Sequence, residues 1–207
     1  MRRLLRLALA CVTLLPHGAA AADAPDGISL SALREERGRI AHKQRRLIFN
    51  NDGCDCLYFP TNLPLTTENF LALRTTPLED SQVGAIAYCT ISSGFSFFTH
   101  RTEAGTIMDR QGSKFGILKG NRNIAREMIA AGTDCLQANI DFARKRGIEA
   151  FWSMRMNDTH DAAHRPDRPY LLFPPLKVQH PDWLVGEPMK RTPVGRWSSV
   201  DYARPEI

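Results

Sequence analysis

The stretch Ile148-Glu149-Ala150-Phe151-Trp152-Ser153-Met154-Arg155-Met156-Asn157-Asp158 begins with apolar residues and ends with polar ones. An earlier stretch, Arg46-Leu47-Ile48-Phe49-Asn50-Asn51-Asp52-Gly53, has the same order. Each predicts a β-strand that runs from a packed interior into a cluster of hydrogen-bonding side chains. In α/β proteins the ligand binds at the carboxyl ends of parallel strands. The two stretches therefore predict an α/β fold whose site lies where the strands end.

Helical periodicity and turn residues predict the elements around these strands. Apolar residues recur at helical spacing from 121 to 146, which predicts one long helix, and Gly147 suits the position after its last turn. A third strand is predicted over 83–91. The other predicted elements are helices over 29–46 and 66–73, the second with Thr66 as its N-cap, and irregular segments over 92–120 and 159–197.

Strand side chains alternate between two faces, so the faces of the 148–158 strand can be compared. One face is apolar throughout and is predicted to lie under helices, which makes Trp152 a core residue: Ile148, Ala150, Trp152, Met154 and Met156. The other face becomes polar toward its end, at Arg155 and Asn157. A β/α barrel has this arrangement on its inner side. A doubly wound open sheet fits less well, because no glycine-rich phosphate loop follows either strand.

The amino terminus has the features of a secretory signal peptide. Arg2, Arg3 and Arg6 precede a short apolar region, and Ala20-Ala21-Ala22 is a small-residue cleavage site. We therefore expect residues 1–22 to be a signal peptide, with cleavage near Ala22 and export to the periplasm or the extracellular space.

About 185 residues follow the signal peptide, enough for one domain with its own core. We assign 23–44 to a lead-in with an amino-terminal helix and 45–207 to the main domain. Loss of three arginines lowers the formal net charge from +5 to +2, and no Lys/Arg stripe with interleaved aromatics remains. Nucleic-acid binding is therefore not expected. No further segment is apolar enough to span a membrane, and no feature points to a particular oligomeric state.

Four cysteines remain after the signal peptide, at Cys54, Cys56, Cys89 and Cys135. Export permits a disulfide, and four cysteines allow three full pairings. Because the cysteines are few and the chain is large, we expect buried free thiols or a single bridge. Cys54-Asp55-Cys56 lacks the second pair or the histidine spacing of a zinc site. The sequence therefore predicts neither a metal nor a cofactor.

Several motifs in order resemble secreted, uncharacterised glycoside hydrolase-like (β/α)8-barrel proteins. The resemblance covers most of the chain after residue 45, and its motifs are the 46–53 strand, the stretch 69–100, Met154-Arg155-Met156-Asn157-Asp158, and His180-Pro181-Asp182-Trp183-Leu184. In such proteins a segment similar to 197–207 leads into a further helix and a strand that carries an acidic pair. The resemblance therefore implies the amino-terminal portion of a (β/α)8 TIM-type barrel, incomplete, with long loops at the carboxyl ends of the strands.

Glycoside hydrolysis usually needs two carboxylates placed across the scissile bond. Asp52 and Asp158 are the candidate catalytic residues, since both follow strands. They are also candidates for substrate binding. The alternative is turn and capping chemistry, which Asp favours without any site. The acids expected of the family lie in the strand that would follow residue 207, so this chain is expected to lack its main catalytic acids.

Further candidate substrate-binding residues are polar or aromatic side chains near the same strand ends: Asn50, Arg155, Asn157, His160 and Trp183. Arg155 needs an acceptor if it is buried, and a structural ion pair is its alternative role. Trp183 is the best candidate for stacking on a sugar ring. His160 and His164 flank Asp161 and would suit a metal if the segment were helical, but the nearby prolines argue against a helix.

These features support three hypotheses. The first is an exported glycoside hydrolase-like protein, truncated and inactive by itself, that acts on a carbohydrate. The second is a non-catalytic carbohydrate-binding or interaction protein that keeps the cleft. The third is a non-functional fragment, because a partial barrel exposes unpaired strand edges and an apolar sheet face.

Overall fold

The computed structural model describes residues 29–91, 94–111 and 120–207, which divide into two units between Gln44 and Arg45. The predicted signal peptide lies outside the described residues. The first unit contributes helix α1 (Leu30–Ala41), whose N-cap Ser29 accepts a hydrogen bond from the Ala32 N–H at 3.2 Å. None of its side chains is fully buried. The helix predicted over 29–46 therefore forms, and it ends at Ala41.

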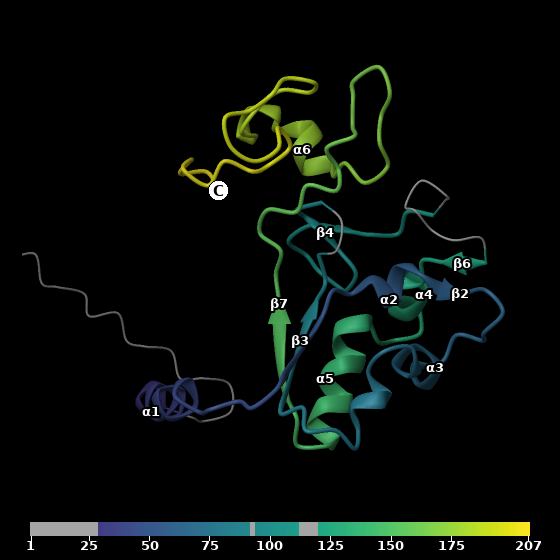
Figure 1. Ribbon diagram of the computed structural model, residues 1–207, viewed down its shortest axis with the longest axis vertical. Helices are drawn as coiled ribbons and strands as arrows, with labels where there is room; N and C mark the ends of the chain where they lie inside the picture. Colours follow the sequence, from purple (N-terminus) through teal and green to yellow (C-terminus); the bar gives the residue numbers. More distant parts are fainter. Residues whose placement is uncertain (1–28, 92–93, 112–119) are drawn as a thin grey trace, which may run out of the picture. The chain divides into compact units, whose positions relative to one another are not determined.

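The second unit is built on a parallel sheet of three strands, β1 (Ile48–Asn51), β3 (Ala85–Cys89) and β7 (Glu149–Ser153), in the order β1-β3-β7. Both pairings are parallel, as the arrows of β3 and β7 show in Figure 1. The predicted α/β class and all three predicted strands are confirmed. Within the described residues this sheet is open and does not close into a barrel.

One face of the sheet packs against helices to form the main core. Helix α5 (Cys135–Lys145) packs against β3 and β7, and α3 (Thr67–Ala72) packs beside α5 (Figure 1). The predicted N-cap Thr66 accepts a hydrogen bond from the Asn69 N–H at 3.1 Å. The fully or nearly buried members of this core come from the sheet, from these helices and from short elements between them: Cys56, Phe59, Phe70, Ile86, Tyr88, Ile124, Ala125, Met128, Cys135, Ala138, Phe142 and Ala143.

The prediction of a single helix over 121–146 is wrong. The segment instead forms strand β6 (Asn121–Arg122), helix α4 (Ala125–Ala130) and α5. The helical path ends because Gly132 adopts φ +88°, a left-handed conformation that glycine tolerates. Asp134 then starts α5, because its side chain accepts the Gln137 N–H at 2.8 Å. The apolar period continued across the break and concealed it.

The predicted face assignment of β7 is correct only at its start. Ile148 packs against the core, but Ala150, Trp152, Met154 and Met156 are exposed rather than covered by helices. The reason is that β7 is an edge strand in the described sheet, with no further strand or helix beside its outer edge, although α5 contacts both β3 and β7. Trp152 is 50% exposed, and its Nε1–H donates to Thr90 Oγ1 at 2.7 Å.

The opposite face of the sheet carries exposed apolar side chains among the described residues of the second unit. Ile48 and Phe151 project from this face and are 56% and 42% exposed. Arg45 lies over the Phe151 ring at 5.0 Å and pairs with Glu149. This face of the described sheet therefore exposes apolar side chains to solvent.

Short elements occupy the connections. They are α2 (Cys54–Leu57), β2 (Phe59–Pro60), η1 (Thr76–Leu78), β4 (Phe97–Phe98) and β5 (Thr106–Ile107). Strand β2 pairs with β6, and β4 pairs with β5. The segment predicted to be a loop over 92–120 thus contains two very short strands among its described residues, while 92–93 and 112–119 lie outside them.

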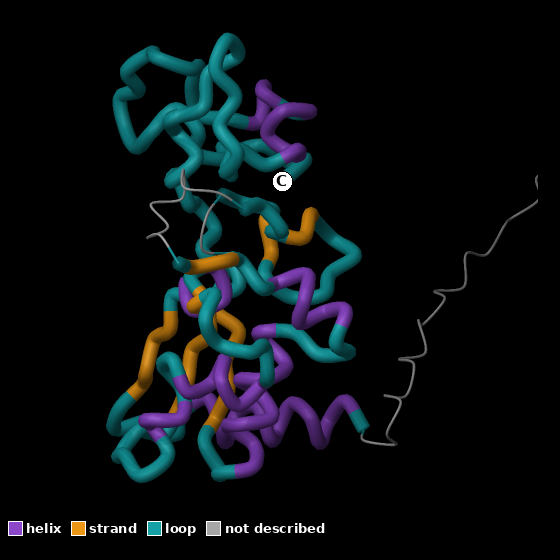
Figure 2. The backbone as a smooth tube through the Cα atoms, turned by 90° about the vertical axis from the view of Figure 1, so that its right-hand side faces the viewer, coloured by secondary structure: helices purple, strands orange, loops and turns teal. Residues whose placement is uncertain are grey.

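The chain after β7, residues 154–207, is called here the carboxy-terminal segment. It is irregular as predicted, except for α6 (Pro175–Gln179) and η3 (Pro181–Trp183), each begun by proline (Figure 2). Its aromatic residues pack on one another: His164 stacks on Phe173 at 3.9 Å, and Phe173 stacks on Trp197 at 5.5 Å. None of the helices in the described residues has the length and apolar character that a membrane crossing requires.

Candidate functional site

The carboxyl end of β1 forms a closed network of hydrogen bonds. Asn51 is buried; its Nδ2–H donates to Asp55 Oδ2 at 2.9 Å, and its Oδ1 accepts the Gly53 N–H at 2.9 Å. Gly53 has φ +74°, and a Cβ there would lie 2.0 Å from the Cys89 carbonyl oxygen. The chain can therefore turn sharply after β1 only with glycine at this position.

Asp55 is the buried acid of this network, and sequence analysis did not single it out. Its Oδ1 accepts the Tyr88 hydroxyl at 2.8 Å and the Cys56 N–H at 2.9 Å. Burial raises the pKa of Asp55, although the hydrogen bonds from Asn51 and Tyr88 oppose that shift. Every oxygen of this carboxylate is occupied by protein donors, which is the pattern of a structural acid.

Asp52 is also engaged by the protein. Its Oδ1 accepts the Cys54 N–H at 3.0 Å and the Arg74 guanidinium at 2.5 Å. Burial alone would raise the pKa of Asp52, but the Cys54 N–H and the Arg74 charge together hold it below its ordinary value. Asp52 is therefore an ionised carboxylate that has the turn chemistry considered as the alternative to a catalytic role and, in addition, an ion pair with Arg74.

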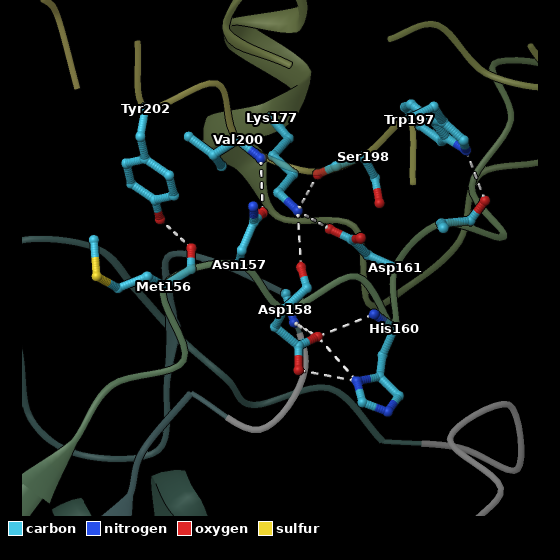
Figure 3. Close-up of polar contacts among 12 residues, drawn as sticks. Met156, Asn157, Asp158, His160, Asp161, Lys177, Trp197, Ser198, Val200 and Tyr202 are labelled. Atoms are coloured by element: carbon cyan, nitrogen blue, oxygen red, sulfur yellow. Dashed lines mark hydrogen bonds and ion pairs between the residues drawn. The ribbon is translucent and has the colours of Figure 1, made fainter. Parts of the chain in front are cut away.

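The carboxyl end of β7 leads to Asp158, the most connected polar residue of the predicted set (Figure 3). Its side chain is only 2% exposed. Oδ1 accepts the Gly94 N–H at 2.9 Å and the His160 N–H at 3.0 Å, and Oδ2 lies 2.9 Å from His160 Nδ1. Because a carboxylate only accepts, the ring Nδ1 carries the proton in this contact.

Gly94 brings a distant loop onto Asp158. It has φ +84°, and a Cβ there would lie 2.7 Å from the Leu172 carbonyl oxygen. Only glycine therefore allows the backbone to approach both Leu172 and Asp158 at this point. Arg155 adds an ion pair to Asp158, with Nη1 3.5 Å from Oδ2.

A cavity of about 500 Å³ opens beside these residues. It is lined by Arg155, Asn157, Asp158, Thr159, His160 and Arg196. Four of these residues were predicted from the sequence as substrate-binding: Arg155, Asn157, Asp158 and His160. The structure therefore brings the predicted residues of the 148–158 strand and the loop after it together around one hollow.

A buried ion pair lies next to the residues that line this cavity. Lys177 of α6 and Asp161 have side chains that are 1% and 0% exposed, and Lys177 Nζ lies 2.5 Å from Asp161 Oδ2. The ammonium also donates to the Ser198 carbonyl at 2.7 Å and the Asp158 carbonyl at 3.4 Å (Figure 3). Burial raises the pKa of Asp161 and lowers that of Lys177, against the attraction between them. One side chain thus ties together three stretches of the carboxy-terminal segment.

The other predicted site residues lie elsewhere or have structural contacts. Asn50 is exposed on the uncovered sheet face, opposite Ala87. Asn157 lines the cavity, but its Oδ1 also accepts the Val200 N–H at 3.0 Å. Trp183 lines a separate, smaller cavity of about 140 Å³, where His180 stacks on its ring at 3.8 Å. The structure therefore does not bring Trp183 to the hollow beside Asp158.

The residues considered as metal ligands have different partners. His160 contacts Asp158, Asp161 pairs with Lys177, and His164 stacks on Phe173 while its Nδ1 accepts the Tyr170 N–H at 3.2 Å. In the described part of the chain, no three His, Cys, Asp or Glu side chains form a group that could hold a metal ion.

The four cysteines considered above are all free thiols in the structure. Cys56, Cys89 and Cys135 are buried. Burial, reinforced by the Asp52 charge, raises the pKa of Cys54 to about 12, although the charges of Arg74 and Arg155 act against the rise. A thiol with so high a pKa is a poor nucleophile at neutral pH.

Sequence analysis missed three residues that shape the site: Gly94, Lys177 and Arg196. Gly94 and Arg196 approach from segments far from 148–158 in the sequence, so no local motif indicated them. Lys177 has a partial signal, because it follows the proline pair Pro174-Pro175 that starts a short helix. A lysine is seldom fully buried, and nothing in its neighbours predicted that it would be.

Neither the models of known protein families nor the curated proteins gave a match to this sequence.

Proposed function

We propose that this protein binds carbohydrate in the hollow at the carboxyl end of β7, as an exported, glycoside hydrolase-like barrel portion. One observation carries the proposal: Arg155, Asn157, Asp158 and His160 line the same cavity. Sugar hydroxyls both donate and accept hydrogen bonds, and this lining offers groups of both kinds. The position beyond a strand's carboxyl end is where α/β proteins bind ligands.

Recognition is better supported than hydrolysis. Asp158 is the one carboxylate among the described residues that line the hollow, and its oxygens already accept hydrogen bonds from Gly94 and His160. The other candidate, Asp52, is paired with Arg74. A glycosidase needs two carboxylates facing the scissile bond. The proposed activity is therefore binding without cleavage, and hydrolysis by this chain would require a second acid in the hollow.

The proposal is tested by titration calorimetry of the purified protein against neutral and acidic oligosaccharides. The variant is His160→Ala, whose side chain is 65% exposed and forms one edge of the hollow. We expect it to weaken binding roughly tenfold, the equivalent of one lost hydrogen bond to a charged or polar ligand group. The matched control is His42→Ala, an exposed histidine of the first unit, which should bind as the parent does.

Two results would count against the proposal. If no saccharide of the panel binds, the hollow is not a carbohydrate site. If reducing ends are released from a polysaccharide and Asp158→Asn abolishes the release, the protein is a hydrolase and recognition alone is too narrow a description.

A further inference from the structure

The hollow beside β7 carries more positive charge than a neutral sugar requires. Arg155 and Arg196 line it, and Asp158 is the one acid among its described lining residues. Guanidinium groups present planar donors that match carboxylate and sulfate oxygens. The charge of the lining therefore favours a ligand that is negative.

Neither arginine uses all of its hydrogen-bond donors in contacts with the described protein. Across residues 29–91, 94–111 and 120–207, the Arg196 guanidinium has no carboxylate within ion-pair distance. Arg155 has an ion pair with Asp158 at 3.5 Å, and 37% of its side chain is exposed. Five N–H groups on each guanidinium need acceptors, so most of them face solvent or a ligand.

The single charge of Asp158 offsets only one of the two guanidinium charges. Its Oδ1 is held by the backbone N–H groups of Gly94 and His160, and its Oδ2 is held by the His160 ring. These fixed donors direct the carboxylate toward the protein, where it is 2% exposed. Asp158 thus serves to orient Arg155 and His160 rather than to compete with a ligand for them.

We propose, as a refinement that rests on the proposed function, that Arg155 and Arg196 clamp the anionic group of an acidic saccharide, a uronate carboxylate or a sulfate ester, in this hollow. The remaining lining, Asn157, Thr159 and His160, is polar and would contact the hydroxyls of the same sugar. Apolar side chains do not line the hollow in the described chain, which disfavours a lipid as the source of the anion.

The test is affinity electrophoresis of the purified full chain in native gels that contain polygalacturonate, dextran sulfate or unmodified dextran. The first two probes separate carboxylate from sulfate, and the third is neutral. We expect an acidic polymer to retard the protein and dextran to retard it less. Arg155→Gln and Arg196→Gln should each weaken the retardation roughly tenfold, because each removes a charge-assisted contact.

Arg191→Gln is the matched control, because Arg191 is exposed, lies in the same segment and does not line the hollow. It should be retarded like the parent. Equal losses in Arg191→Gln and Arg196→Gln would mean that the attraction is a general surface-charge effect, and would overturn the clamp. Binding of dextran as strongly as either acidic polymer would overturn the clamp while leaving carbohydrate binding intact. Failure of all three polymers and of the neutral oligosaccharides would overturn both.

Discussion

The carboxyl ends of β1 and β7 begin from the same kind of sequence and end as different structures. Asn51 is the last residue of β1 and Asp52 follows it, and their side chains are hydrogen-bonded to Gly53, Cys54, Asp55 and Arg74. Asn157 and Asp158 follow β7, where the adjoining arginine keeps most of its donors free. A strand that ends in Asn and Asp therefore indicates where a binding site can form. Residues from distant parts of the chain then determine whether its polar groups are bonded within the protein or remain available to a ligand.

The largest expected effect tests whether the hollow at the carboxyl end of β7 depends on the buried ion pair between Lys177 and Asp161. Lys177→Met removes the ammonium and leaves the Asp161 carboxyl group without its charged partner in the interior, which costs about 3–5 kcal/mol of unfolding free energy. Urea denaturation measures this loss. Lys190→Met is the control, because Lys190 pairs with Glu187 at the surface, and its loss should change stability by no more than about 1 kcal/mol. Similar small losses in both variants would show that the Lys177–Asp161 ion pair does not stabilise the carboxyl end of β7.

The tightness of the closed end is tested next, with a pair of glycines. Gly53 and Gly147 both have positive φ, but a Cβ at Gly53 would meet the Cys89 carbonyl oxygen at 2.0 Å, whereas nothing lies within 4 Å at Gly147. Gly147→Ala should cost about 1–2 kcal/mol from backbone strain alone. Gly53→Ala should cost distinctly more, because the collision adds to the strain. Equal costs, measured by thermal unfolding, would show that the β1 turn can relax.

A smaller effect separates stability from binding. Tyr88→Phe removes the hydroxyl that donates to Asp55 and leaves a buried carboxylate one hydrogen bond short. We expect a loss of about 1.5–3 kcal/mol in unfolding free energy, with saccharide binding unchanged. His160→Ala should weaken binding and should cost less stability, because Asp158 keeps the Arg155 ion pair and the backbone N–H groups of Gly94 and residue 160. Weaker saccharide binding by Tyr88→Phe, measured in the same calorimetric titration, would mean that the two strand ends are coupled.

The smallest effect is a pH dependence of the carboxy-terminal segment. Burial lowers the pKa of His164 below its ordinary 6.5, although the Asp161 charge opposes the shift. A lowered folded-state pKa means that the neutral ring is favoured by folding. This contribution to stability is therefore complete above the unfolded-state pKa and is lost as the pH falls through the folded-state value.

His164→Asn keeps an acceptor for the Tyr170 N–H but cannot titrate. Unfolding free energies measured between about pH 7.5 and 5.5 should fall less steeply for this variant than for the parent. His42→Asn, in the exposed end of the first unit, should keep the parental slope. A variant slope as steep as the parent's would assign the acid sensitivity to other groups.

Much of the fold was predictable because it depends on local patterns. The three strands, the Thr66 cap and the glycine after α5 follow from alternation, capping chemistry and conformational freedom. The break before α5 was not predicted, because the apolar period continued through Gly132 and outweighed the cap at Asp134. The covered face of β7 was predicted wrongly, because a strand's own alternation does not show how many helices lie beside it.

The candidate site was only partly predictable, for a physical reason. The sequence indicated Arg155, Asn157, Asp158 and His160, which are close together along the chain. It could not show that Asp52 would be neutralised by Arg74, or that Arg196 would reach the hollow from 41 residues beyond Arg155. These pairings depend on long-range packing. Trp183, predicted from its aromatic ring and its place in the long irregular segment, lies in another cavity.

The positions of the buried thiols and of one buried amine allow local opening of the sheet core and of residues 154–207 to be measured separately. Cys56 and Cys135 are fully buried between the sheet and its helices, while residues 154–207 contain no cysteine. Lys177 is an amine enclosed within that later segment. The rate at which a thiol reagent modifies Cys56 or Cys135 therefore reports opening of the sheet core alone. The acylation rate of Lys177 reports opening of the later segment. Each part of the native protein therefore contains a side chain whose modification rate measures its local opening.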